Sequence, residues 1–134
     1  FDAMETLTTF LHENLKNTLV INSKTDSRTS LQEAPLLKPV NELRVRIEPD
    51  TNTIFIGLDT MRSYLKALGK IELDDFIKKL KDNNVLNRRS GDLKVLHKGL
   101  DISGAAKRCL WIDNSSFDEI KTNNLPLDIP RRVN

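Results

Sequence analysis

Two short amphipathic segments with a glycine between them constrain the fold of this chain more than any other feature. Apolar residues recur at helical spacing over residues 59–68 and 73–83, so each segment is expected to form a helix with one apolar face. Gly69 is placed to end the first helix. Two short helices joined by a tight turn that contains glycine are typical of a helix-turn-helix. The apolar faces consist of Leu58, Met61, Leu65 and Leu68 in the first helix and Leu73, Phe76, Ile77 and Leu80 in the second.

A β-hairpin is expected before these helices. Residues 43–47 alternate strictly, which predicts a strand with Leu43 and the following valine and isoleucine toward a core. Arg44 and Arg46 would then face outward. Residues 53–56 are apolar and β-branched, and they are expected to form the returning strand.

Strands and a basic loop are expected after the helices. Residues 85–89 and 93–97 look extended, with residues 90–92 as a turn between them, and residues 109–112 form a short apolar strand. The span 98–108 is basic and contains two glycines, as the wing of a winged helix does. The sequence therefore predicts an α+β fold, a winged helix-turn-helix with an N-terminal helix and a preceding β-hairpin.

The N-terminal part of the chain is organised differently. Residues 3–19 carry apolar side chains at helical spacing, and Asp2 is a suitable N-cap for that helix. The next residues are rich in Ser, Thr, Asn and Asp and have no period, which indicates a connector. The expected division is an N-terminal helix in 1–21, a connector in 22–42, a winged-helix domain in 43–113 and a polar tail in 114–134.

Basic residues concentrate in the predicted winged helix. The chain carries a formal net charge of only +2, but residues 51–108 hold 12 Lys and Arg against 7 Asp and Glu. Cations contact phosphates, so this excess indicates DNA, double- or single-stranded, as the partner. The expected contacts are Lys78, Lys79 and Lys81 on the second helix, Arg88 and Arg89 after it, and Lys98, Lys107 and Arg108 on the wing, with Arg62 and Lys66 of the first helix able to touch the backbone.

The start of the second helix does not suit a base-reading role. In a helix-turn-helix the N-terminal end of the second helix usually meets the base edges. Here that end carries Glu72, Asp74 and Asp75, which would repel phosphates. We therefore expect weakly sequence-specific binding to the phosphate backbone, with the wing prominent.

Catalysis and metal binding have little support in the sequence. It contains no glycine-rich phosphate loop and no HExxH or GxSxG motif. Cys109, beside Leu110 and Trp111, is expected to be a buried, inert thiol, and His97 a surface or packing residue. Asp74-Asp75 suit the first turn of a helix, where carboxylates are favoured. We expect no catalytic residue, no metal site and no cofactor.

The same sequence argues for a cytoplasmic protein without membrane contact. No apolar run approaches the roughly 20 residues that span a bilayer, and no basic-then-apolar signal segment opens the chain. A single cysteine excludes an internal disulfide, which fits a reducing compartment.

The segments 43–65, 69–86 and 94–113 together resemble a known family. They are similar to the C-terminal winged-helix domain of helicase-like replication proteins of bacterial mobile elements (phages, plasmids and chromosome cassettes), a type labelled as a domain of unknown function. The resemblance rests on apolar spacing plus Gly104 and the pair Arg108-Cys109. It implies a helicase-associated role in DNA replication, an ATPase upstream of this chain, and the parent protein's other domains as further partners. A start at Phe1 instead of Met fits that expectation.

Two alternatives stay open at this point. A winged helix can dock a protein partner instead of DNA. A small transcription regulator with this fold would need a dimer to read paired half-sites.

Overall fold

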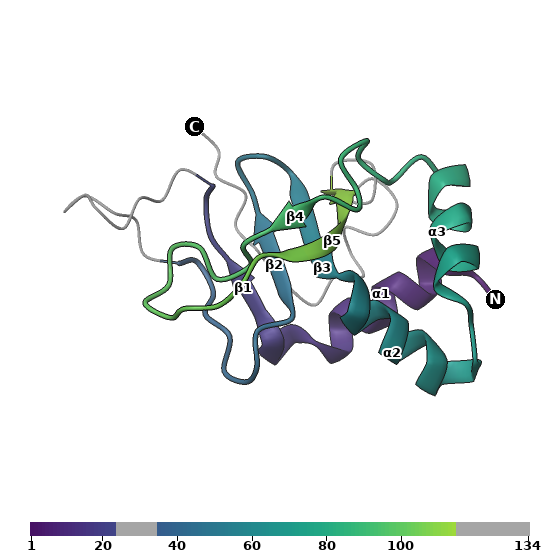
Figure 1. The fold of residues 1–134 in the computed structure, drawn as a ribbon, viewed down its shortest axis with the longest axis horizontal. Coiled ribbons are helices and arrows are strands. Elements are labelled where there is room, and N and C mark those ends of the chain that lie inside the picture. Colours follow the sequence, from purple (N-terminus) through teal and green to yellow (C-terminus); the bar gives the residue numbers. More distant parts are fainter. Residues whose placement is uncertain (24–34, 115–134) are drawn as a thin grey trace.

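The computed structural model describes residues 1–23 and 35–114. This part of the chain is a mixed α+β fold with three α-helices, one short 3-10 helix and five strands. The helices gather on one side of the sheet, and the loop between the last two strands reaches away from them (Figure 1). Most of the connector expected in 22–42, and all of the polar tail beyond Asn114, lie outside the described residues.

The N-terminal helix is confirmed but is shorter than expected. Helix α1 spans Ala3–Glu13, and the Asp2 carboxylate accepts hydrogen bonds from the amides of Met4 and Glu5 at 3.0 and 3.1 Å. A 3-10 turn, Leu15–Asn17, then leads into strand β1, Thr18–Val20, so the prediction of a helix through residue 19 is wrong. The helix ends early because residues 18–20 pair in parallel with β2, a strand that lies later in the sequence.

The β-hairpin is confirmed. Strands β2 (Val45–Glu48) and β3 (Thr53–Gly57) pair antiparallel, with Val45 opposite Ile56. The expectation that Arg46 faces solvent is wrong, because its side chain is only 1% exposed. Leu43 also departs from the prediction, since it precedes the strand and packs on the opposite side of the sheet from Val45.

The helix pair is confirmed as well. Helix α2 spans Leu58–Gly69 and helix α3 spans Leu73–Asp82. The predicted helix end at Gly69 is off by one residue, because Lys70 adopts the left-handed conformation (φ 57°) and its amide bonds back to the helix carbonyls. Ile71, the next residue, packs against the core, as the hydrophobic residue after a left-handed helix cap commonly does.

The strands after α3 differ most from the prediction. Strand β4 is only Leu93–Lys94, and strand β5 spans Lys107–Asp113. Residues 85–89 and 93–97 do not form two strands joined by a turn. Instead, the chain up to Asn87 and the chain from Gly91 onward both hydrogen-bond to the same edge of β5. Asn87 donates to the Trp111 carbonyl at 2.8 Å, and the Asp92 carbonyl accepts from the Cys109 amide at 3.1 Å.

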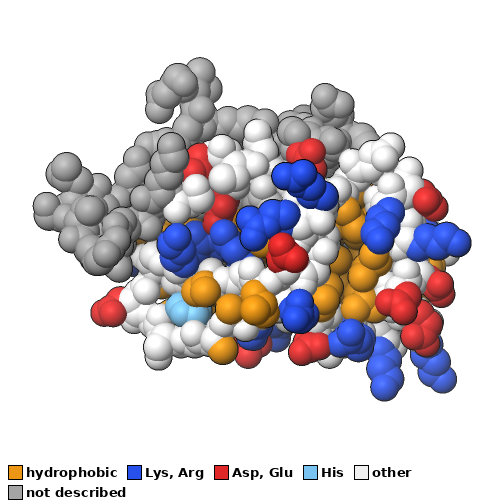
Figure 2. Space-filling model, turned by 45° about the horizontal axis from the view of Figure 1, so that its top comes forward, with side chains coloured by type: hydrophobic (Ala, Val, Ile, Leu, Met, Phe, Trp, Pro, Cys, Tyr) orange, Lys and Arg blue, Asp and Glu red, His pale blue; other side chains and the backbone are white. Residues whose placement is uncertain are grey.

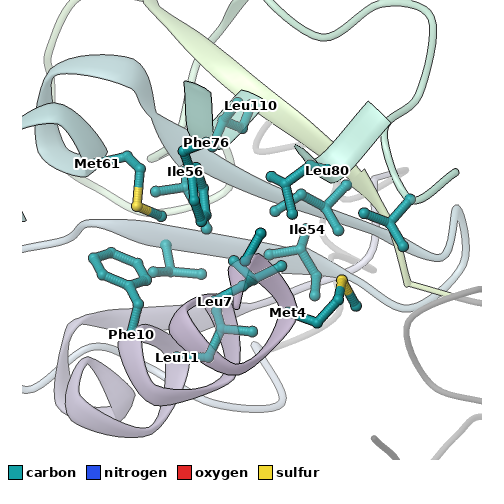
Figure 3. Packing of buried hydrophobic residues seen from close by; sticks show 14 of the residues in the cluster. Met4, Leu7, Phe10, Leu11, Ile54, Ile56, Met61, Phe76, Leu80 and Leu110 are labelled. Carbon is teal, nitrogen blue, oxygen red and sulfur yellow. The ribbon is translucent and has the colours of Figure 1, made fainter. Parts of the chain in front are cut away.

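The sheet order is β1-β2-β3-β5-β4, so β5 lies between β3 and β4. One face, which we call the helix face, carries the main core. Side chains from α1, β3, α2, α3 and β5 meet there (Figure 3). The labelled residues of this core are Met4, Leu7, Phe10, Leu11, Ile54, Ile56, Met61, Phe76, Leu80 and Leu110.

The other face of the sheet, which we call the outer face, carries a second apolar cluster. Phe55 of β3 and Cys109 and Trp111 of β5 are buried there, with Leu96 packed over them. Side chains alternate between the two faces along β5, so Leu110 and Ile112 belong to the helix face. The outer face is therefore covered by the chain that follows β4 and not by a helix.

Candidate nucleic-acid interface

A buried ion network holds the base of the predicted wing. The Arg46 Nε lies 2.7 Å from Glu48 Oε2, and the Lys94 Nζ lies 3.0 Å from the same oxygen. The Arg46 Nη1 also donates to the backbone carbonyls of Leu96 at 3.0 Å and Lys98 at 2.6 Å. A guanidinium can serve several acceptors at once because its donors are arranged in a planar fork. Arg46 therefore ties the chain after β4 to the hairpin.

This tie places the start of the wing on the outer face. Leu96 is buried in the outer cluster, directly beside the carbonyls that Arg46 holds. Helix α3 packs on the helix face through Phe76 and Leu80. The green loop between β4 and β5 extends away from α3 in the ribbon view (Figure 1). The base of the wing and α3 therefore lie on opposite faces of the sheet.

The two basic residues at the start of β5 point to different faces. Lys107 shares the outer face with Cys109, and it is exposed. It pairs across the strands with Lys94, whose ammonium lies 4.4 Å from the centre of the Phe55 ring. Arg108 has the opposite orientation and donates to the Gly91 carbonyl at 3.2 Å. The structure therefore brings Lys107 next to Lys94 and separates it from Arg108.

Arg89 joins the same outer face from the loop before β4. Its guanidinium carbon lies 4.4 Å from the centre of the Trp111 ring, and its Nε lies 3.1 Å from Asp92 Oδ2. Arg88, its neighbour, is exposed in the same loop. We call Arg89, Lys94 and Lys107 the basic edge, because they line the outer face at the β4–β5 side of the sheet.

The α3 lysines form a separate group. Lys78, Lys79 and Lys81 are all exposed. The Lys79 ammonium lies 4.7 Å from the centre of the Phe1 ring and 3.4 Å from the Phe1 carbonyl oxygen. The acidic residues Asp74 and Asp75 occupy the first turn of this helix, as the sequence indicated. The helix surface therefore carries charges of both signs.

A shallow depression of about 590 Å³ lies at the turn between α2 and α3. It also has mixed charge, because basic side chains of α2 face the acidic start of α3 across it. The lining residues are Arg62, Lys66, Lys70, Ile71, Glu72, Leu73 and Asp74. Figure 2 shows the same pattern on a larger scale, with Lys and Arg side chains in several places and Asp and Glu side chains between them.

Sequence reasoning missed two members of the outer-face group. Lys94 was not among the expected contacts, and Trp111 was considered only as a buried neighbour of Cys109. The missed signal is the period of two along β5, which puts Lys107, Cys109 and Trp111 on one face. Lys98, by contrast, was expected in the group, and it is exposed at the start of the wing loop.

The three residues that carry the family resemblance have structural roles. A Cβ on Gly104 would lie 3.1 Å from a carbon of the His97 ring, so the ring would have to shift by a few tenths of an ångström to admit a side chain there. Arg108 holds the loop at Gly91. Cys109 is buried, and burial raises the pKa of its thiol to about 11. The thiol is therefore protonated at neutral pH, as expected for an inert core cysteine.

No group of three or more His, Cys, Asp or Glu side chains is positioned to hold a metal ion within residues 1–23 and 35–114. None of the helices in these segments has the length and apolar character needed to cross a bilayer.

Comparisons with protein-family models, with curated proteins and with solved structures found no significant match.

Proposed function

We propose that this chain is a non-catalytic winged-helix domain that binds DNA within a larger replication or transfer protein, mainly through the phosphate backbone. The order of elements supports the winged-helix part of the proposal. Helices α2 and α3 follow strand β3 with a tight turn, and β4 and β5 then enclose a long loop as the two strands of a wing would. The replication or transfer context rests on the family resemblance.

One observation carries the binding proposal, namely the basic edge. Arg89 and Lys107 are exposed on one face within a short stretch of sheet, and the Lys94 ammonium lies 4.4 Å from the centre of the Phe55 ring and 5.6 Å from that of Trp111. Exposed cations on one face suit the regular charge of a nucleic-acid backbone. The acidic start of α3 argues against close approach of that helix to base edges. The contact surface is therefore centred on the β4–β5 side.

The test is fluorescence anisotropy with a labelled DNA at two salt concentrations. Sequence-independent binding predicts a Kd in the range of about 10⁻⁶ to 10⁻⁴ M at physiological salt, and the affinity should fall as the salt concentration rises. Lys107→Ala should weaken binding and reduce the salt slope by about 1, as for the loss of one phosphate contact. Lys16→Ala is the matched control, because Lys16 is exposed in the 3-10 turn before β1, at the far edge of the sheet. Equal binding by both variants would refute the proposed surface.

A protein-docking role is the second candidate, and one observation favours it. Leu93 belongs to β4, an edge strand of the sheet, and it is 56% exposed. Exposed apolar side chains on an edge strand suit pairing with another chain. A Leu93→Ser variant separates the two candidates, because DNA binding through the basic edge should survive that change. A regulator that reads paired half-sites would instead be a dimer by light scattering.

A further inference from the structure

The basic edge contains a contiguous group of cations and rings that goes beyond phosphate binding. The guanidinium carbon of Arg89 lies 4.4 Å from the centre of the Trp111 ring. Trp111 meets Phe55 edge to face, with ring centres 4.8 Å apart. Lys94 lies 4.4 Å from the centre of Phe55. It also lies 5.6 Å from the centre of Trp111, so Arg89 and Lys94 both contact the ring pair on the outer face.

The ring beneath Arg89 is held in place. Trp111 is only 8% exposed, and its indole Nε1 donates to the Asp92 carbonyl at 3.3 Å. Its amide also donates to the Ser90 hydroxyl at 3.2 Å. The backbone around it is bonded on both sides, to Phe55 of β3 and to the loop before β4. A guanidinium that rests on this ring therefore has a rigid support.

The guanidinium itself is accessible from solvent. The Arg89 side chain is 59% exposed although it lies over Trp111. Its ion pair with Asp92 is also solvent-exposed, and such pairs contribute little to stability. The Asp92 carboxylate is nevertheless a negative charge beside the stack, and Asp113 of β5 lies on the same face as Trp111. Lys107 is exposed on the same face, next to Lys94, whose own charge is paired with Glu48 at 3.0 Å.

The type of nucleic acid follows from what can reach such a stack. Bases in a duplex are stacked on their neighbours, so their faces are not available. Bases of a single strand can be splayed out and stacked on aromatic rings or on Arg guanidinium planes. A duplex would gain only the charge of Arg89, whereas a single strand would gain its flat surface as well.

We propose that the outer face binds single-stranded DNA, with one base stacked on the exposed side of the Arg89 guanidinium above Trp111 and the adjoining phosphates on Lys107. This inference rests on the proposed function and names the form of DNA that the site takes.

The experiment compares three labelled ligands of equal length by anisotropy at low salt. They are an oligothymidylate, the same backbone with abasic sites in place of the bases, and a duplex. The oligothymidylate should bind at least about fivefold more tightly than the abasic strand, because stacking of a base adds to phosphate contact. The emission of Trp111, the only tryptophan in the chain, should change with the oligothymidylate alone.

Two variants test the assigned residue. Arg89→Lys keeps the charge but removes the planar group, so it should lose the preference for the oligothymidylate and bind all three ligands alike. Lys107→Ala should weaken all three ligands by a similar factor. Because both side chains are exposed, both variants should keep the wild-type unfolding transition in urea.

The outcomes separate this inference from the proposed function. Equal affinity for the oligothymidylate and the abasic strand, or full preference retained by Arg89→Lys, would overturn the stacking inference while DNA binding stands. Tighter binding of the duplex would do the same. No binding of any of the three ligands at low salt would overturn both.

Discussion

Replacement of Arg46 by alanine is expected to destabilise the protein by about 3–5 kcal/mol, the usual cost of breaking a buried ion pair by removing one partner. The side chains of Arg46 and Glu48 are 1% and 2% exposed, so water does not screen their interaction. Removal of the guanidinium leaves Glu48 with Lys94 as its remaining cation. It also removes the donor to the carbonyls of Leu96, which is buried, and Lys98, which is partly buried; an orphaned buried acceptor costs about 1–3 kcal/mol. Since small domains have about 5–15 kcal/mol in total, the loss should be large.

Urea unfolding followed by Trp111 fluorescence measures this loss, with Arg44→Ala as the control. Arg44 belongs to the same stretch of chain, but its side chain is 44% exposed and its partner Glu42 is 76% exposed. Exposed pairs contribute about 0–1 kcal/mol. Arg44 also donates one hydrogen bond to Asn14 Oδ1 at 3.1 Å, which adds about 0.5–1.5 kcal/mol, so the control should lose clearly less than Arg46→Ala. Arg46→Lys should fall between the two, because one ammonium cannot serve Glu48 and both carbonyls. If Arg46→Ala costs no more than Arg44→Ala, the network does not hold the chain after β4 on the hairpin.

Three further predictions follow from single residues. Gly69→Ala should raise the urea midpoint, because nothing lies within 4 Å of its Cβ position and alanine favours the helix, and Gly104→Ala should gain less because the His97 ring has to shift to admit the Cβ. Cys109 should react with a thiol reagent at pH 8 only after unfolding, because burial raises its pKa to about 11; rapid reaction of the folded protein would contradict this. Burial of Tyr64, together with the hydrogen bond that its hydroxyl donates to Glu13, raises its pKa to about 12. The contribution of this tyrosine to folding stability should therefore be complete below pH 10 and decline as pH rises from 10 toward 12. Absorbance at alkaline pH reports this directly because Tyr64 is the only tyrosine, and a midpoint near 10 in the folded protein would count against it.

Local patterns were sufficient for the helix pair and the hairpin. The stripe of apolar residues in α3 matches its buried face, since Leu73, Phe76 and Leu80 are all buried. Asp2 caps α1 as its residue type indicated. These features depend on contacts between residues close in sequence, which is why periodicity and capping could predict them.

Features that depend on distant partners were missed. Strand β1 has only three residues, and nothing in its local sequence announces that it will pair with β2. The two-residue strand β4 was expected to be longer, because the extended pattern continues to residue 97. After β4, the carbonyls of Leu96 and Lys98 accept hydrogen bonds from Arg46 instead of from a neighbouring strand. Sheet pairing is decided by these non-local contacts.

The candidate site divides in the same way. The sequence by itself determined which residues are cationic, that they concentrate between residues 51 and 108, and that the start of α3 is acidic. Only the tertiary structure decided which of them lie together. Because side chains alternate along β5 and Arg46 holds the chain after β4 on the outer face, Lys107 and Arg89 share a surface with Trp111. Charge is a property of each residue, but a shared surface is a property of the way the strands pair and pack.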